Sequence, residues 1–128
     1  MTQKKVTKEE ALALAQRAVQ ILDSKKAEDI CLLEIGDLTV LADYFVIANG
    51  TSTTQVRALA DEIAFRIHEE TGVSPLRTEG YDGSNWILID YGYAIIHVFY
   101  RETREFYNLE KLWADGHRID ISALLKAE

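Results

Sequence analysis

The sequence predicts an α+β (mixed α/β) domain in which helices pack on a mixed sheet of about five strands. Apolar residues recur at helical spacing in three segments, and short apolar runs bounded by turn residues lie between them. A strand, helix, strand passage implies a parallel pair joined by a right-handed crossover, and the tight connections imply antiparallel pairs. With 128 residues, the chain (1–128) is expected to form one domain.

Three helices are predicted, and the first two carry clear end signals. Residues 7–10 read Thr-Lys-Glu-Glu, a capping box ahead of an apolar stripe that continues to about Lys25. A hydroxyl of the turn 49–52 can cap a second helix, for which Gly72 is a suitable C-terminal cap. The third helix is expected over 102–114, with Phe106, Leu109 and Trp113 as its core stripe.

Strands are expected wherever a short apolar run ends in turn residues. Tyr91-Gly92-Tyr93 is a hairpin signal between the last two of them. Beyond residue 114 the chain is polar and lacks apolar periodicity until Ile119, so 115–128 is expected to be a weakly docked tail. The predicted strands cover 29–35, 44–48, 75–79, 86–90 and 94–100.

The charge balance bears on the kind of partner. Fourteen basic and 21 acidic residues give a formal net charge of −7, and no basic stripe is found. Such a field repels phosphate backbones, so direct nucleic-acid binding is not expected. A basic protein surface is the more natural partner, although moderate acidity can also serve solubility alone.

Cysteine usage and the N-terminus suggest the compartment. The single cysteine, Cys31, lies in an apolar run and is expected to be a buried, unreactive thiol, as in a reducing environment. The first residues have no apolar stretch long enough for a signal peptide, and no later run approaches a membrane span. A cytoplasmic protein is therefore expected.

Candidate catalytic groups do not assemble into a site. The Gly50-Thr51-Ser52 turn between a strand and a helix resembles the opening of the nucleotidyltransferase fold, but the paired carboxylates that hold its metal ions are absent. The three histidines lack metal-ligand spacing. We therefore predict no catalytic, cofactor or metal site. The alternative is a residual nucleotidyltransferase-type or nucleotide-binding domain with Thr51, Ser52 and Asp90 near a nucleotide.

An aromatic, acidic segment is the remaining candidate for a functional surface. Residues 79–110 carry eight aromatic side chains, and six acidic against two basic residues. Tyrosine and tryptophan join a large apolar area to a polar tip and are frequent at interface hot spots. Phe99, Phe106 and Trp113 are assigned to the core. For Trp86, Tyr91 and Tyr107 a binding role and a core role remain equally open, and His97 is either a core residue or part of a polar spot on the sheet.

Four ordered motifs, spanning 43–52, 79–92, 96–99 and 106–113, resemble the ribosomal silencing factor (Iojap) family over about residues 7 to 114. The resemblance implies a nucleotidyltransferase-like fold without the catalytic carboxylates. It also implies a translational repressor that binds the large ribosomal subunit through protein L-fourteen, blocks joining of the small subunit and acts when nutrients are scarce. Some members of the family form homodimers.

The resemblance also implies a recognition surface on the strand hairpin and the last helix. Matching positions of this sequence carry most of the expected contact residues, and Tyr91 is added from its place beside them. The expected partner contacts are therefore Trp86, Asp90, Tyr91, His97, Tyr107, Glu110 and Trp113.

Overall fold

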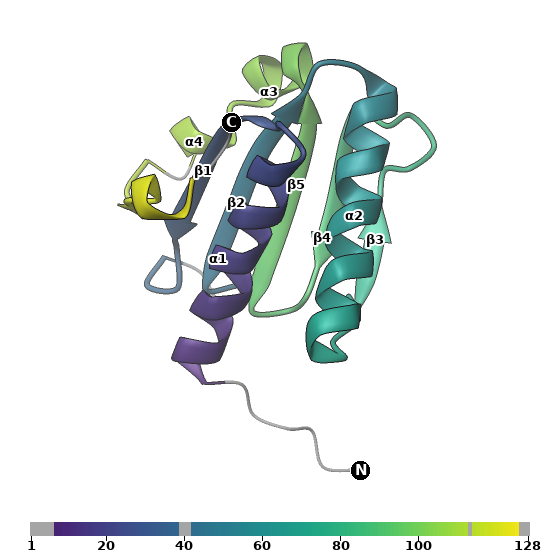
Figure 1. Cartoon of the computed structure of the whole chain (residues 1–128). Coiled ribbons are helices and arrows are strands. Elements are labelled where there is room, and N and C mark those ends of the chain that lie inside the picture. Colours follow the sequence, from purple (N-terminus) through teal and green to yellow (C-terminus); the bar gives the residue numbers. More distant parts are fainter. Residues whose placement is uncertain (1–6, 39–41, 113, 126–128) are drawn as a thin grey trace.

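A computed structural model describes residues 7–38, 42–112 and 114–125 and has one mixed sheet of six strands. Helices α1 and α2 lie side by side on one face of this sheet (Figure 1). The order across the sheet is β3-β4-β5-β2-β1-β6. Along the chain the elements are α1 (Lys8–Ser24), β1 (Glu28–Glu34), β2 (Tyr44–Gly50), α2 (Thr53–Thr71), β3 (Arg77–Glu79), β4 (Trp86–Asp90), β5 (Ala94–Tyr100), α3 (Arg101–Tyr107), α4 (Leu109–Leu112), β6 (His117–Ile119) and the 3-10 helix η1 (Ser122–Leu124).

The predicted mixed sheet is confirmed, with one strand more than expected. Strands β2 and β5 are parallel, and the other neighbours are antiparallel. The additional strand is β6, which pairs with β1 between Leu32 and Ile119. Its three residues are too few to produce a visible alternation of polar and apolar residues, so the sequence pattern did not predict it.

The predicted helix ends are also confirmed. The Thr7 hydroxyl accepts from the Glu10 amide at 3.1 Å, while the Glu10 carboxylate accepts from the Thr7 amide at 3.2 Å. Ser52 caps α2 by accepting from the Gln55 amide at 3.0 Å. Gly72 ends that helix with a left-handed φ of 77°. The three caps fix where the two long helices begin and where α2 ends.

The last predicted helix is not continuous, which corrects the expectation for 102–114. Asn108 adopts a left-handed conformation with φ 48° and separates α3 from α4. Asparagine tolerates this conformation better than most residues. The backbone amide of Asn108 donates to the Arg104 carbonyl at 2.8 Å. Leu109 is buried as expected. The side chain of Phe106 and all of Trp113 lie outside the described part of the chain.

Strand alternation gives the sheet two different faces. In β4, Ile87 and Ile89 point into the core beneath α1 and α2, whereas Trp86 and Leu88 point to the opposite face. Cys31 lies buried on that opposite face, and burial raises the pKa of its thiol. No helix among the described residues is long and apolar enough to cross a membrane.

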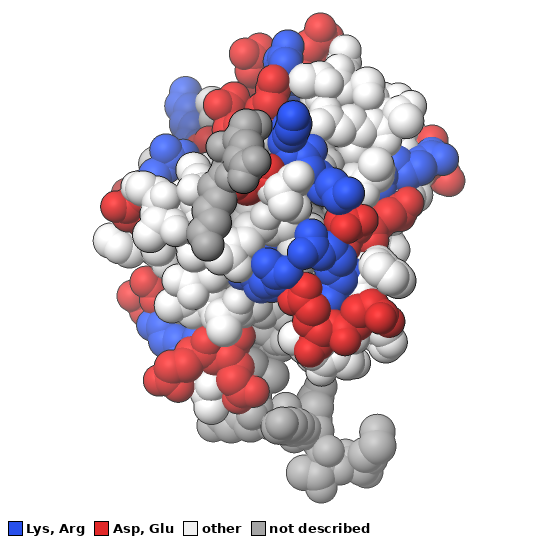
Figure 2. Space-filling model, in the orientation of Figure 1, with Lys and Arg blue, Asp and Glu red and all other residues white. Residues whose placement is uncertain are grey.

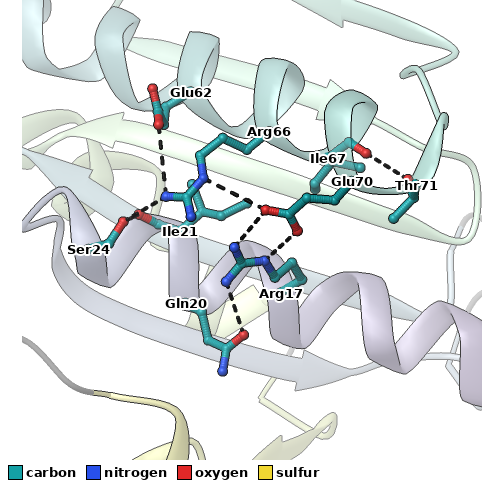
Figure 3. Close-up of polar contacts among 9 residues, drawn as sticks. All are labelled: Arg17, Gln20, Ile21, Ser24, Glu62, Arg66, Ile67, Glu70 and Thr71. Carbon is teal, nitrogen blue, oxygen red and sulfur yellow. Dashed lines mark hydrogen bonds and ion pairs between the residues drawn. The ribbon is translucent and has the colours of Figure 1, made fainter.

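The outer surface of α1 and α2 carries acidic and basic side chains close together (Figure 2). Across the helix–helix contact, Arg17 donates from Nε and Nη2 to the Glu70 carboxylate, both at 2.7 Å (Figure 3). Arg66 lies 3.8 Å from the Glu62 carboxylate and donates to the Ser24 hydroxyl at 3.2 Å (Figure 3). The charged groups of this contact therefore satisfy one another.

Candidate functional site

Five rings from three strands and one helix gather on the sheet face opposite α1 and α2. Strand pairing brings them together. Trp86 of β4 lies opposite Phe99 of β5. His97 of β5 lies opposite Ile47 of β2, and Phe45 is two residues before Ile47 on the same strand. The Trp86 ring stacks on Phe99 with centroids 4.9 Å apart and meets Tyr107 at 4.7 Å. We call this set the aromatic cluster: Phe45, Trp86, His97, Phe99 and Tyr107.

His97 holds the indole of Trp86 in place. Trp86 Nε1 donates to His97 Nδ1 at 3.1 Å, and because an indole can only donate, the imidazole must accept at Nδ1 and carry its hydrogen on Nε2. Burial lowers the pKa of His97 to about 3, so the ring is neutral near pH 7. The imidazole and the Phe45 ring also form a T-shaped contact, with centroids 4.6 Å apart. His97 is thus a positioning residue for Trp86.

The structure corrects the expectation that His97 contacts a partner directly. Its side chain is buried beneath Trp86, and Nε2 has no hydrogen-bond partner within the described ranges. What the cluster exposes is the outer part of Trp86 and the ring of Tyr107, which is 50% exposed. Phe99 lies fully buried below, as the sequence predicts. The accessible surface is therefore a pair of rings on a rigid base.

The turn before β4 fixes the other side of Trp86. Gly80 has φ 95°, and a Cβ at this position would lie 2.0 Å from the Trp86 carbonyl oxygen, so only glycine fits. Arg57 of α2 donates from Nη2 to the Tyr81 carbonyl at 2.9 Å and to the Ser84 hydroxyl at 3.0 Å. Sequence reasoning missed Arg57, because nothing local links a helix residue to a turn more than twenty positions later.

Asp90 lies at the opposite end of β4 from Trp86 and is engaged within the chain. Its Oδ1 accepts from the Gly92 amide at 2.7 Å, and its Oδ2 accepts from Arg77 Nε at 3.1 Å. The carboxylate therefore braces the hairpin and the edge strand β3. Its side chain is only 14% exposed, which leaves little of it for a partner.

Tyr91 is not part of the exposed surface, contrary to the expectation. Its side chain is buried in the core beneath α1 and α2, where Ile87 and Ile89 also lie. Burial raises the pKa of its phenol to about 12. The physical reason is strand parity, since residues 87, 89 and 91 share the face opposite to that of Trp86.

Glu110 takes part in a network of ion pairs and hydrogen bonds within the chain, which we call the clasp. Its carboxylate accepts from Arg104 Nη2 at 2.7 Å and from Arg118 at 3.3 Å, and the Arg104 hydrogen bonds lower the pKa of Glu110. Arg104 is itself buried and donates to Asn49 Oδ1 at 3.0 Å and to the Asp29 carbonyl. The clasp ties α3 and α4 to β1, β2 and β6. Trp113, the last expected contact, lies outside the described residues.

The turn that resembles a nucleotidyltransferase opening is occupied by its own side chains. Ser52 caps α2, and the Thr51 amide and hydroxyl both bond to Gln55 Oε1, at 2.6 and 2.9 Å. Asp90 is at the far end of β4, bonded to Arg77. Across residues 7–38, 42–112 and 114–125, no group of three or more His, Cys, Asp or Glu side chains is placed to hold a metal ion.

Comparison with known proteins decides the family. The family model described as "Ribosomal silencing factor during starvation" matches residues 8–128. The chain belongs to this family. It is 39% identical over 112 residues to "Ribosomal silencing factor RsfS" of Halalkalibacterium halodurans, which covers 88% of this chain and 95% of that protein.

Two further relatives extend the comparison beyond that bacterial protein. The chain is 37% identical over 112 residues to mouse "Mitochondrial assembly of ribosomal large subunit protein 1"; the match covers 86% of this chain and 49% of the longer mouse protein. A crystal structure of a protein from Chromobacterium violaceum matches with a TM-score of 0.75 at 32% identity, covering 91% of this chain and 93% of that one. The α+β fold is thus that of solved ribosomal silencing factor structures.

Proposed function

We propose that this ribosomal silencing factor binds the large ribosomal subunit in the cytoplasm, through ribosomal protein L-fourteen. The bound protein covers the surface that the small subunit needs and so slows translation under nutrient limitation. No chemical step is involved, because occupying one surface is sufficient. The observation that carries the proposal is the ring pair of partly buried Trp86 and half-exposed Tyr107, with centroids 4.7 Å apart above a buried base.

The fixed position of the Trp86 indole supports a role in recognition. The hydrogen bond from Trp86 to His97, the stacking on Phe99 and the bonds of Arg57 to the preceding turn fix the indole before any partner arrives. A pre-organised aromatic side chain loses little conformational entropy on binding, so more of its contact energy appears as affinity. Exposed, fixed tryptophan and tyrosine side chains are the usual anchors of protein interfaces.

Charge and family names support the kind of partner. The formal net charge of −7 favours encounter with a basic protein surface. The names of the bacterial and mouse relatives refer to ribosomal silencing and to the large ribosomal subunit. Asp90 and Glu110 are already paired within the chain, so the acidic residues among the expected contacts act mainly as braces of the surface.

Co-sedimentation with isolated large subunits tests the proposal. The wild-type protein should pellet with large subunits and prevent added small subunits from joining them. Tyr107→Ala should weaken binding by about 30-fold, the cost of about 2 kcal/mol typical of an interface anchor. Phe65→Ala is the matched control, because Phe65 is 64% exposed but lies on α2, on the other side of the sheet.

Three results would contradict the proposal: large subunits that remain free, subunits that still join when the protein is bound, or equal losses of binding for both variants.

The same preparations, run without ribosomes, measure whether the free protein is a monomer or the homodimer that the family resemblance allows. A thermal melt with nucleotide and magnesium tests the enzymatic alternative. A reproducible rise in the melting temperature would favour it.

A further inference from the structure

A groove of about 690 Å³ borders the exposed ring pair, between the turn 80–85 and α3. Its walls include three aromatic side chains, Trp86, Tyr100 and Tyr107. The lining also includes Gly80, Gly83, Asn85 and Thr103. The one charged side chain among the described lining residues is the exposed carboxylate of Glu102, and no lysine or arginine lines the groove.

Glu102 differs from the two arginines of α3 because no described residue pairs with it. Arg101 is bonded to the Glu28 carboxylate at 2.7 Å, and Arg104 to the Glu110 carboxylate at 2.7 Å. Either arginine would have to leave an existing ion pair to neutralise Glu102. The groove therefore places an unpaired carboxylate beside three aromatic side chains.

We propose that this groove accepts one basic side chain, an arginine or lysine, of the protein partner, and that Glu102 selects its charge. Aromatic faces attract a cation through the ring quadrupole, and a guanidinium can stack on a ring while it bonds to a carboxylate. Phosphate groups and acidic side chains are repelled by the same carboxylate. The inference rests on the proposed function, since it names what the partner contributes beside Trp86 and Tyr107.

The same helix offers a matched control on its other side. Glu105 is also exposed, but it lines a separate pocket of about 530 Å³ that contains Asp29 and Glu110 together with Arg101, Arg104 and Arg118. The three arginines offset the carboxylates of that pocket, so Glu105 is not expected to recruit a cation. Glu102→Gln and Glu105→Gln remove the same charge from the same helix and differ only in which pocket loses it.

The first test measures the affinity of the full chain for large ribosomal subunits. Glu102→Gln should weaken binding by about tenfold, in line with a cation held by rings and a carboxylate, while Glu105→Gln should bind as the wild type does. Wild-type affinity for Glu102→Gln, or equal losses for both variants, would overturn the proposal. Because Glu102 lies in the first turn of α3, thermal melts of both variants show whether a loss comes from destabilisation instead.

The second test needs no ribosome and therefore separates the two proposals. N-acetyl-arginine amide is titrated into the isotope-labelled protein, and the indole resonance of Trp86 is followed by NMR, with neutral N-acetyl-citrulline amide as the control. The arginine probe should shift this resonance in the wild type but not in Glu102→Gln, and citrulline should not shift it. Equal shifts from both probes, or none, would overturn the groove proposal. A positive titration with no subunit binding would overturn the proposed function alone.

Discussion

The two sides of the sheet differ in whether the side chains on the outer surface already have partners within the chain. On the helix-covered face, Arg17 and Glu70 form a bidentate pair across α1 and α2, and Arg66 reaches both Glu62 and Glu70 (Figure 3). On the other face, the rings of Trp86 and Tyr107 remain partly open to solvent. Both faces bury a dense apolar layer against the sheet, so the contrast lies in the outer surface alone.

This difference indicates where binding energy is available. A partner that approached the ion-paired helices would have to replace contacts that already exist, and exposed ion pairs contribute little in exchange. The aromatic cluster offers apolar area that is already ordered and still in contact with water. Charged groups on the surface are therefore a poor guide to recognition here, and partly exposed rings on a rigid base are a better one.

The sharpest test of this contrast compares the loss of a core side chain with the loss of a surface ring. Leu59 is a buried residue of α2, and Leu59→Ala should lower the free energy of unfolding by about 3 kcal/mol, because it leaves a cavity. Tyr107→Ala should lower it by about 1 kcal/mol or less, since half of that ring is already exposed, yet it should lose subunit binding. Urea denaturation measures both. Equal destabilisation would assign Tyr107 to the core.

The turn that supports Trp86 should be the next most sensitive feature. Gly80→Ala places a Cβ 2.0 Å from the Trp86 carbonyl at φ 95° and should cost about 2 kcal/mol of stability. In Gly83→Ala the new Cβ would meet only the Asn85 amide, at 3.7 Å, so this control should be almost neutral. Thermal melts compare the two variants. A neutral Gly80→Ala would show that the turn can move without disturbing Trp86.

The buried histidine should make stability depend on pH. Its pKa is about 3 in the folded protein against an ordinary 6.5, so the unfolded chain takes up the proton first as the pH falls. The free energy of unfolding contributed by His97 should therefore decrease from about pH 6.5 downward, by at most about 1.4 kcal/mol per pH unit. Urea denaturation between pH 7 and pH 5 measures this slope, above the range where carboxylates titrate.

His97→Gln is the variant that isolates this effect. The glutamine oxygen can still accept from the Trp86 indole, but the side chain no longer titrates. His68 and His117 remain in both proteins, so their contributions cancel in the difference. The variant should have a shallower dependence on pH than the wild type. Identical slopes would mean that His97 is not held neutral by its burial.

Sequence patterns predicted what depends on near neighbours. The capping box at Thr7, the Ser52 cap, the Gly72 end and the hairpin after Asp90 are all set by residues within a few positions, and all are found. The predicted parallel pair is found between β2 and β5, although β3 and β4 as well as α2 lie between them in the chain. Trp86 and Tyr107 were also singled out from the sequence, and both rings keep solvent-accessible area in the structure.

The remaining features depend on contacts between distant residues. The pairing of Arg104 with Glu110 requires the break at Asn108, and the pairing of β6 with β1 joins residues over eighty positions apart. The burial of Tyr91 was predictable, because its parity with Ile87 and Ile89 places it under the helices. Composition drew attention to the aromatic segment, and the alternation of side chains along the strand separates Tyr91, under the helices, from Trp86 on the other face.

The smallest expected effect concerns the ion pairs themselves. Glu70→Gln removes the carboxylate whose pKa is lowered by the Arg17 hydrogen bonds, so any stabilisation from this pair is present near pH 7 and lost in acid. Solvent and salt screen an exposed pair. The loss in the free energy of unfolding should therefore lie close to the detection limit of urea denaturation and vanish at high salt. Subunit binding should be unchanged.

Glu102→Gln makes the same chemical change on a carboxylate that has no described partner, and should alter binding but hardly stability. If Glu70→Gln also weakened binding, the ion-paired helices would belong to the recognition surface, and the division between the two faces would be wrong.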